Sequence, residues 1–153
     1  FRLRDAWFND GRAPSDHLKS LDFFRPEFRP DEILAFLNLL YSQQKLVFYG
    51  VSELTLDLIF PVVYVGFFLF IIVRTFGAVP AKFLIVFPLA AGVFDLFENS
   101  LIAYISFTFD GTLPGLAKPV FYFNFLKWSA AGLSASISVV GMISLLIRKI
   151  RAR

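Results

Sequence analysis

The chain has 153 residues, of which 57% are hydrophobic and 18% aromatic. Soluble domains are usually about 45–50% apolar, and the excess here comes in blocks, so the composition indicates a membrane protein. The net charge of +3 is too small to suggest a nucleic-acid partner. Cys is absent and His17 is the single histidine, which excludes disulfides, thiolate metal sites and a multi-histidine haem or metal site within this chain.

Residues 1–30 are polar but contain scattered aromatic and Arg side chains. Disordered tails are poor in aromatic residues, whereas protein interfaces are enriched in aromatic residues and Arg. We therefore expect an extended arm, lying either across a partner subunit or back on its own bundle. The aromatic residues expected to make these contacts are Trp7, Phe8, Phe23, Phe24 and Phe28. The chain begins at Phe1 without Met, so we also expect a processed N-terminus or further residues upstream.

Residues 31–49 are predicted to form an amphipathic helix in the membrane interface. Asp31 and Glu32 follow Pro30, a combination typical of the start of a helix. One face has apolar residues at helical spacing, namely Ile33, Phe36, Leu37, Leu40 and Val47. We expect a bend at Gly50, after which the membrane bundle begins.

Residues 50–147 contain three apolar segments, and crossing a membrane needs about 20 residues. The spans are predicted at 54–73, 83–107 and 120–147. The predicted fold class is therefore all-α, a bundle of three transmembrane helices preceded by an interfacial helix and an extended arm.

The charges around the spans predict their orientation. Arg74 and Lys82 bracket the first connection, and a basic tail over 148–153 follows the third span. This tail contains Arg148, Lys149, Arg151 and Arg153, which are also candidates for binding anionic lipid head groups. By the positive-inside rule the C-terminus is expected on the matrix side of a mitochondrial inner membrane, or on the cytoplasmic side of a bacterial one.

Four ionisable residues fall within the expected spans: Asp57, Asp95, Glu98 and Lys127. A charge at the bilayer centre costs from about 2.5 to over 10 kcal/mol, so these groups should face protein or water. Asp95, Glu98 and Asn99 have i, i+3, i+4 spacing and share one stripe of a helix. The expected depths bring the groups of all three spans together, which predicts one polar cluster. We expect Lys127 to pair with Glu98 or Asp57. The remaining carboxyl groups are expected to be protonated, or to hold a cation or a donor from another chain.

The third span is unusually rich in small residues, which let membrane helices approach closely. Helix packing is therefore predicted for two rows at spacing i, i+4. Their members are Ala130, Ser134 and Ser138 in one row, and Gly132 and Ser136 in the other.

Four sequence elements resemble a group of small multi-pass bacterial membrane proteins of uncharacterised function. They are Pro-Asp-Glu opening an amphipathic helix that ends in Tyr (30–49), Leu-Asp-Leu-Ile-Phe-Pro-Val-Val-Tyr (56–64), Phe-Asp-Leu-Phe-Glu-Asn (94–99) and Leu-Lys-Trp (126–128). The resemblance covers most of residues 30–147. It implies that Asp57, Asp95, Glu98, Asn99 and Lys127 form one pattern. Members of that group have another N-terminal span, where this chain has its aromatic arm.

Three roles remain open for the polar cluster: hydrogen bonding between helices, proton or ion handling, and catalysis. The chain has no phosphate-binding glycine loop, nucleophile elbow or metal-ligand pair on a helix, so we expect no catalytic residue, metal or cofactor. The expected function is a non-catalytic accessory subunit of a larger membrane complex, such as a respiratory complex. Its partners would be other integral membrane subunits and membrane lipids. The alternative is a small membrane enzyme, or a proton- or ion-coupled carrier that uses the cluster.

Overall fold

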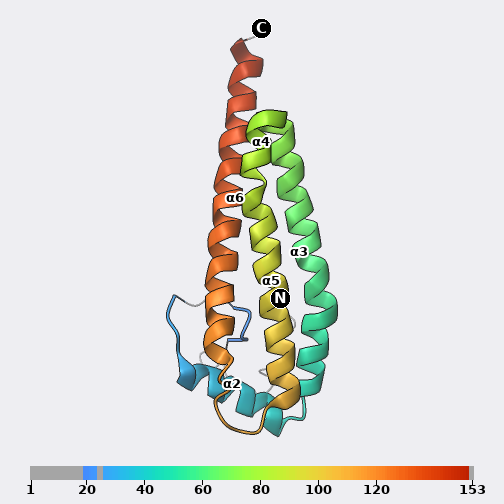
Figure 1. The fold of residues 1–153 in the computed structure, drawn as a ribbon, viewed down its shortest axis with the longest axis vertical. Helices are drawn as coiled ribbons and strands as arrows, with labels where there is room; N and C mark the ends of the chain where they lie inside the picture. Colours follow the sequence, from blue (N-terminus) through green and yellow to red (C-terminus); the bar gives the residue numbers. More distant parts are fainter. Residues whose placement is uncertain (1–18, 24–25, 152–153) are drawn as a thin grey trace.

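The computed structural model describes residues 19–23 and 26–151. Within this part of the chain the protein is helical and has no strand, which confirms the predicted all-α class. The helices, in chain order, are α2 (Pro30–Ser42), α3 (Leu46–Phe76), α4 (Ala78–Leu84), α5 (Val86–Thr108) and α6 (Ala117–Arg151) (Figure 1). Most of the predicted arm, including Trp7, Phe8 and Phe24, lies outside the described residues.

Three helical segments are long and apolar enough to cross a membrane, as predicted: Leu46–Phe76, Pro80–Thr108 and Ala117–Arg151. Many of their large apolar side chains are exposed on the outer surface of the bundle. Soluble proteins rarely expose so large a continuous apolar area to water. On α3, for example, Phe67 is 59% exposed and Phe70 is 71% exposed. An outer surface of this kind suits the hydrocarbon core of a bilayer.

The interfacial helix ends earlier than predicted. The structure breaks the expected 31–49 helix after Ser42, and the residues from Leu46 onward already belong to α3. A Schellman-type ending explains the break. Gln44 has a φ of 56°, its N–H donates to the Tyr41 carbonyl at 3.0 Å, and the N–H of Lys45 donates to the Leu40 carbonyl at 2.8 Å.

Two details of that prediction were therefore wrong. Val47, expected on the apolar face of the interfacial helix, belongs to α3 and is 63% exposed. Gly50, expected at a bend, lies inside α3. A side chain there would meet Ser106 and Phe107, so the missing Cβ allows α5 to approach α3 closely.

The second span has a break near its start, between α4 and α5 at Ile85. Pro88 explains this break, because proline has no N–H to donate to the carbonyl of Leu84, four residues earlier. The third span is longer than predicted. Arg148, Lys149 and Arg151 form the last turn of α6, where basic side chains complement the helix dipole, and Arg153 lies outside the described residues.

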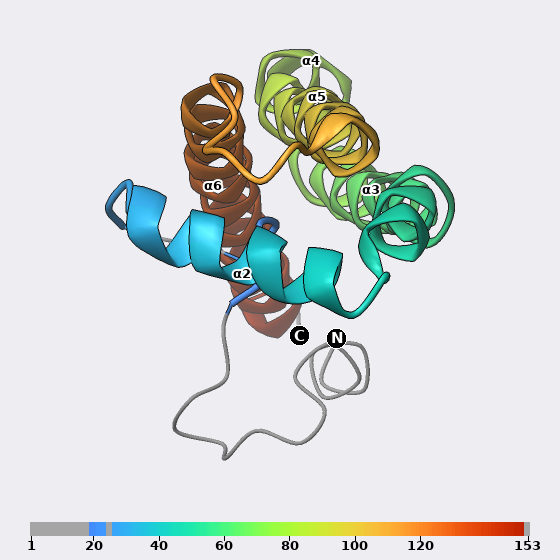
Figure 2. The same cartoon turned by 90° about the horizontal axis from the view of Figure 1, so that it is seen from below.

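Helix α2 crosses the end of the bundle at which α3 begins and α5 ends (Figures 1 and 2). Four residues of its predicted apolar face are buried there: Ile33, Phe36, Leu37 and Leu40. They pack in one core with residues from the ends of all three spans, which include Tyr49, Ile102, Ile105 and Val120. This end of the bundle, which we call the base, is closed by α2.

The two predicted rows of small residues on α6 have different surroundings. Ala130, Ser134 and Ser138 are buried, whereas Gly132 and Ser136 are exposed. Farther from the base, a side chain at Gly141 would meet Thr75 and Phe76, so α6 touches α3 there. Helix α5 packs along both α3 and α6, which contact each other less. The two outer helices thus meet far from the base and separate nearer to it.

Candidate functional site

The polar stripe of α5 faces the interior of the bundle. Asp95, Glu98 and Asn99 are only 4%, 0% and 1% exposed. Their i, i+3, i+4 spacing places them on the side of α5 that lies between α3 and α6. A helix in a membrane keeps such groups away from lipid, because hydrocarbon offers no hydrogen-bond partners.

Lys127 of α6 binds two of these side chains at once. Its Nζ lies 3.2 Å from Asp95 Oδ1 and forms a second ion pair with Glu98 Oε2. Lys127 is itself 8% exposed. The structure therefore brings together Asp95, Glu98 and Lys127, which we call the ion cluster.

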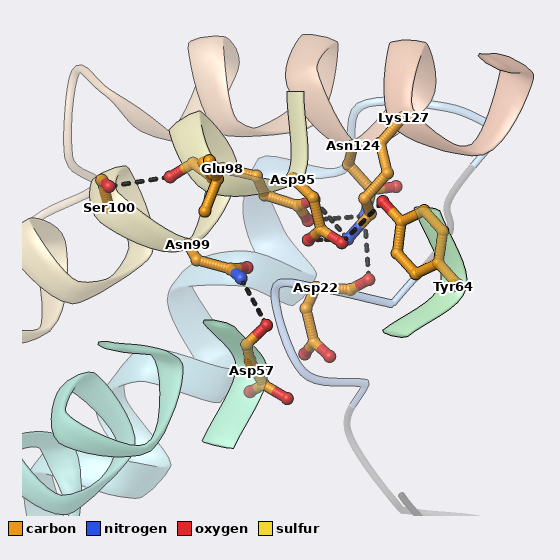
Figure 3. A network of polar contacts seen from close by, with 10 residues as sticks. Asp22, Asp57, Tyr64, Asp95, Glu98, Asn99, Ser100, Asn124 and Lys127 are labelled. Atoms are coloured by element: carbon orange, nitrogen blue, oxygen red, sulfur yellow. Dashed lines mark hydrogen bonds and ion pairs between the residues drawn. The ribbon is translucent and has the colours of Figure 1, made fainter. Parts of the chain in front are cut away.

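Tyr64 and Asn124 complete the hydrogen bonding of the two carboxylates (Figure 3). The Tyr64 hydroxyl, from α3, donates to Asp95 Oδ2 at 3.0 Å. The Asn124 amide, from α6, donates to Glu98 Oε1 at 2.7 Å. All three spanning helices thus contribute a side chain to the network.

Asp57 joins this region in a different way from that expected. Asn99 Nδ2 donates to the backbone carbonyl of Asp57 at 3.2 Å, in the turn of α3 next to the cluster. Lys127 pairs with Asp95 and Glu98, and no ion pair of Lys127 with Asp57 is present among the described residues. The Asp57 side chain is half-buried and lines the cavity described below.

A short segment before α2 packs on the same bundle. Leu21 is buried and its N–H donates to the Tyr49 hydroxyl at 3.1 Å. The carbonyl of Asp22 accepts a hydrogen bond of 2.8 Å from Asn124, the residue that also binds Glu98. For residues 19–23, the structure therefore agrees with the arm folding back on its own bundle.

A cavity of about 750 Å³ lies between α3 and α6, beside the ion cluster. Asp57, Phe60, Tyr64 and Phe68 line it from α3 at spacings of three and four residues, which is one stripe of the helix. On α6 the facing residues are small, namely Ala131, Gly132 and Ala135. Small side chains opposite large ones leave the space open where α3 and α6 separate.

The walls of the cavity differ in polarity. Asp95 and Asn99 of α5 and Lys127 of α6 lie along it, and Asp22 and Phe23 line it from the segment before α2. Phe60 is 49% exposed and Trp128 is 47% exposed, so two residues that line the cavity also reach the outer surface. The cavity therefore opens sideways, between two helices whose outer faces suit lipid.

The side chains of this arrangement are already engaged with one another by ion pairs and hydrogen bonds. Asp95 and Glu98 share the single ammonium group of Lys127, and a hydroxyl and an amide donate to them. Among the described residues, no group of three His, Asp or Glu side chains is placed to hold a metal ion. The chemistry that these residues support is hydrogen bonding, ion pairing and the exchange of a proton.

Of the other predicted site residues that the structure describes, Phe23 and Gly132 line the cavity, and the rest are not among the residues that line it. Phe28 contacts Phe121 in a T-shaped arrangement with ring centroids 5.8 Å apart, and Phe23 is 46% exposed. Sequence reasoning missed the cavity-lining roles of Ser20, Asp22 and Trp128. Trp128 could have been found from the sequence, because it directly follows the predicted site residue Lys127. Nothing in the sequence placed Asp22 against the third span.

Comparison with protein-family models, with curated proteins and with solved structures finds no match to the chain. The fold and the site define its class by themselves. It is an all-α protein with three helices fit to span a membrane, a buried ion cluster and a cavity that opens sideways.

Proposed function

We propose that the protein binds a small membrane-soluble molecule in the cavity between α3 and α6. The observation that carries this proposal is that two residues of the ion cluster, Asp95 and Lys127, line a mostly apolar cavity. Ligand pockets of about 300–1,000 Å³ with mostly apolar walls and a few convergent polar groups are typical of small-molecule sites. The cavity of about 750 Å³ falls within that range.

The sideways opening supports entry from the bilayer. A molecule dissolved among lipid chains would reach the cavity between Phe60 and Trp128 without crossing water. Its apolar part would contact the aromatic stripe of α3 and the small residues of α6. Its polar part would meet Asp95 and Lys127, where a hydrogen bond gains strength from the low dielectric constant of the surroundings.

A pair of glycine substitutions tests this proposal. Gly132 lines the cavity and Gly66 of α3 does not, yet a Cβ at either position meets nothing within 4 Å. Gly132→Leu should fill the cavity, whereas Gly66→Leu should add an equal side chain outside it. Native mass spectrometry of gently extracted protein should show a bound small molecule in the wild type and in Gly66→Leu, and a loss of most of it in Gly132→Leu. Equal occupancy in the two variants would contradict the proposal.

The accessory-subunit role expected from the sequence stays a prediction, and one observation supports it. Gly132 and Ser136 form a small-residue row on an exposed face of α6, where a helix of another subunit could approach closely. Native gel electrophoresis with mass spectrometry of the co-migrating chains tests this role. Migration in fixed stoichiometry within a large assembly would support it, as would release from that assembly on deletion of residues 1–29. Migration as a monomer would count against it.

We propose the mitochondrial inner membrane as the location, with a bacterial inner membrane as the alternative, and the C-terminus on the matrix or cytoplasmic side. Arg148, Lys149 and Arg151 support this orientation, and they would bind anionic head groups there. The chain has no native Cys, so single substitutions can be labelled without background. A membrane-impermeant thiol reagent added from the opposite side should label Thr112→Cys, between α5 and α6, and spare Lys149→Cys. The reverse pattern would overturn the orientation.

A further inference from the structure

We propose that the cavity takes a hydrophobic organic cation, and that this cation binds in exchange for one proton held by the ion cluster. The inference rests on the proposed function and specifies its ligand. It is carried by the charges of the ion cluster and by the position of Asp95 on the cavity wall.

The ion cluster contains two carboxyl groups for one ammonium group. Lys127 can neutralise one of them, and the other leaves an excess negative charge among residues that are at most 8% exposed. An uncompensated charge at such a site is strongly disfavoured. Since the described residues supply no second cation to the cluster, we expect a bound proton or a bound cation to compensate it.

In the part of the chain that the structure describes, the groups that face Asp95 include no cation besides Lys127. Tyr64 and Asp57 lie on the side of α3, Glu98 lies on α5 itself, and Asp22 lies in the segment before α2. Among the described residues, Lys127 is the only Lys or Arg that lines the cavity. Among these residues, the charge that Lys127 leaves unbalanced is that of the ion cluster itself.

The apolar lining of the cavity favours a hydrophobic cation. Asp95 lines the cavity and Glu98 does not, so Asp95 is the carboxylate of the ion cluster that a ligand can reach. Lys127 lies nearer the base than Ala135, which is about 12 Å farther along α6 at 1.5 Å per residue. Phe60, Phe68 and Ala135 offer contacts to an apolar body, while Asp95 offers a counter-charge.

The exchange conserves charge and atoms. In the proposed exchange, the ion cluster holds one carboxyl proton before the cation enters, and Lys127 stays protonated. Entry of a monovalent cation breaks one carboxyl O–H bond, and the proton passes to water. The cation then forms an ion pair with the carboxylate, and no oxidant, reductant or co-substrate is needed.

Tetraphenylphosphonium is a suitable probe, and triphenylphosphine oxide is its neutral counterpart. Binding to the purified full chain in detergent is followed by isothermal titration calorimetry in buffers of different ionisation enthalpy. We expect the phosphonium ion to bind more tightly than the neutral probe and to release close to one proton per cation. Its affinity should rise by up to about tenfold per pH unit wherever the proton is fully bound in the empty protein.

Two matched variants locate the exchange. Asp95→Asn leaves Glu98 and Lys127 as a neutral pair, so proton release should vanish and affinity for the phosphonium ion should fall at least tenfold. Asp110→Asn removes an exposed carboxylate in the loop after α5 and should leave both unchanged. The release measured on the wild type needs no variant, so the inference remains testable even if Asp95→Asn fails to fold.

The outcomes separate this inference from the proposed function. If both probes bind equally, without proton release, and Gly132→Leu blocks both, the cavity is a binding site but cation exchange is wrong. If neither probe binds, and native mass spectrometry finds equal occupancy in Gly132→Leu and Gly66→Leu, the proposed function fails as well. Proton release that persists in Asp95→Asn would overturn the assignment to the ion cluster.

Discussion

Replacement of Lys127 by Met tests the energetic role of the ion cluster. Lys127 is 8% exposed and binds both Asp95 and Glu98. Its removal leaves two carboxyl groups without their cation, and breaking a buried ion pair costs about 3–5 kcal/mol. Since a folded protein is stable by only about 5–15 kcal/mol, we expect Lys127→Met to lose a large part of its free energy of unfolding.

A compensating variant separates lost charge balance from lost packing. Adding Asp95→Asn and Glu98→Gln to Lys127→Met removes all three charges and retains acceptors for Tyr64 and Asn124. Neutral replacements of a buried ion network are often tolerated, so this triple variant should recover most of the lost stability.

Reversible unfolding in mixed detergent micelles, followed by circular dichroism, measures these changes. Lys118→Met is the matched control, because Lys118 is exposed in the first turn of α6 and should change stability by less than about 0.5 kcal/mol. A loss below about 1 kcal/mol for Lys127→Met would refute the reasoning. So would a triple variant no more stable than the single one.

Further predictions concern packing, a helix end and a loop. Gly141→Leu should destabilise the bundle by about 1–3 kcal/mol in the same assay, because the new side chain would meet Thr75, and a neutral effect would contradict the close approach of α3 and α6. Gln44→Gly should stabilise the protein by about 0.5–1 kcal/mol, since Gln44 has a φ of 56° and glycine adopts such angles without the usual steric cost. The Thr112 hydroxyl and amide donate to Asp110 and hold the pKa of that carboxyl below its ordinary value. These bonds therefore stabilise the loop fully at pH values above the ordinary carboxyl pKa. Their contribution is lost as the pH falls through the lowered pKa of Asp110. Thr112→Val should raise the Asp110 pKa toward its ordinary value in a ¹³C NMR titration, and an unchanged titration would show that the hydroxyl bond has no effect.

Local features of the sequence were sufficient to predict the fold class. Runs of about 20 or more apolar residues predict spanning helices, because only a helix satisfies its backbone hydrogen bonds within one segment in lipid. The inward direction of Asp95, Glu98 and Asn99 follows from helical spacing together with the cost of charge in hydrocarbon. Lys127 was assigned to the same region on the same physical grounds.

The ends of helices were predicted less well than the helices themselves. A helix end depends on the conformation of one or two residues, and the identity of these residues often does not reveal that conformation. Gln44 adopts a conformation that glycine usually occupies, so the end of α2 carried no glycine signal. Gly50 looked like a bend, but it lies inside α3 because the approach of α5 requires a small residue there.

The choice of partners within the cluster was decided by tertiary structure alone. Spacing along one helix cannot show that Lys127 bridges Asp95 and Glu98, while Asp57 takes part through its backbone carbonyl. That choice depends on the rotation of α3 and α6 about their own axes, which is fixed by close contacts such as that between Gly141 and Thr75.

The cavity, too, exists only in three dimensions. The sequence predicted that the small residues of α6 allow close packing, and the buried row of Ala130, Ser134 and Ser138 lies at helix contacts. Ala131, Gly132 and Ala135 lie on the neighbouring stripe, which faces the space where α3 and α6 separate. A small side chain permits close approach or leaves a void, and only the path of the facing helix decides between these outcomes.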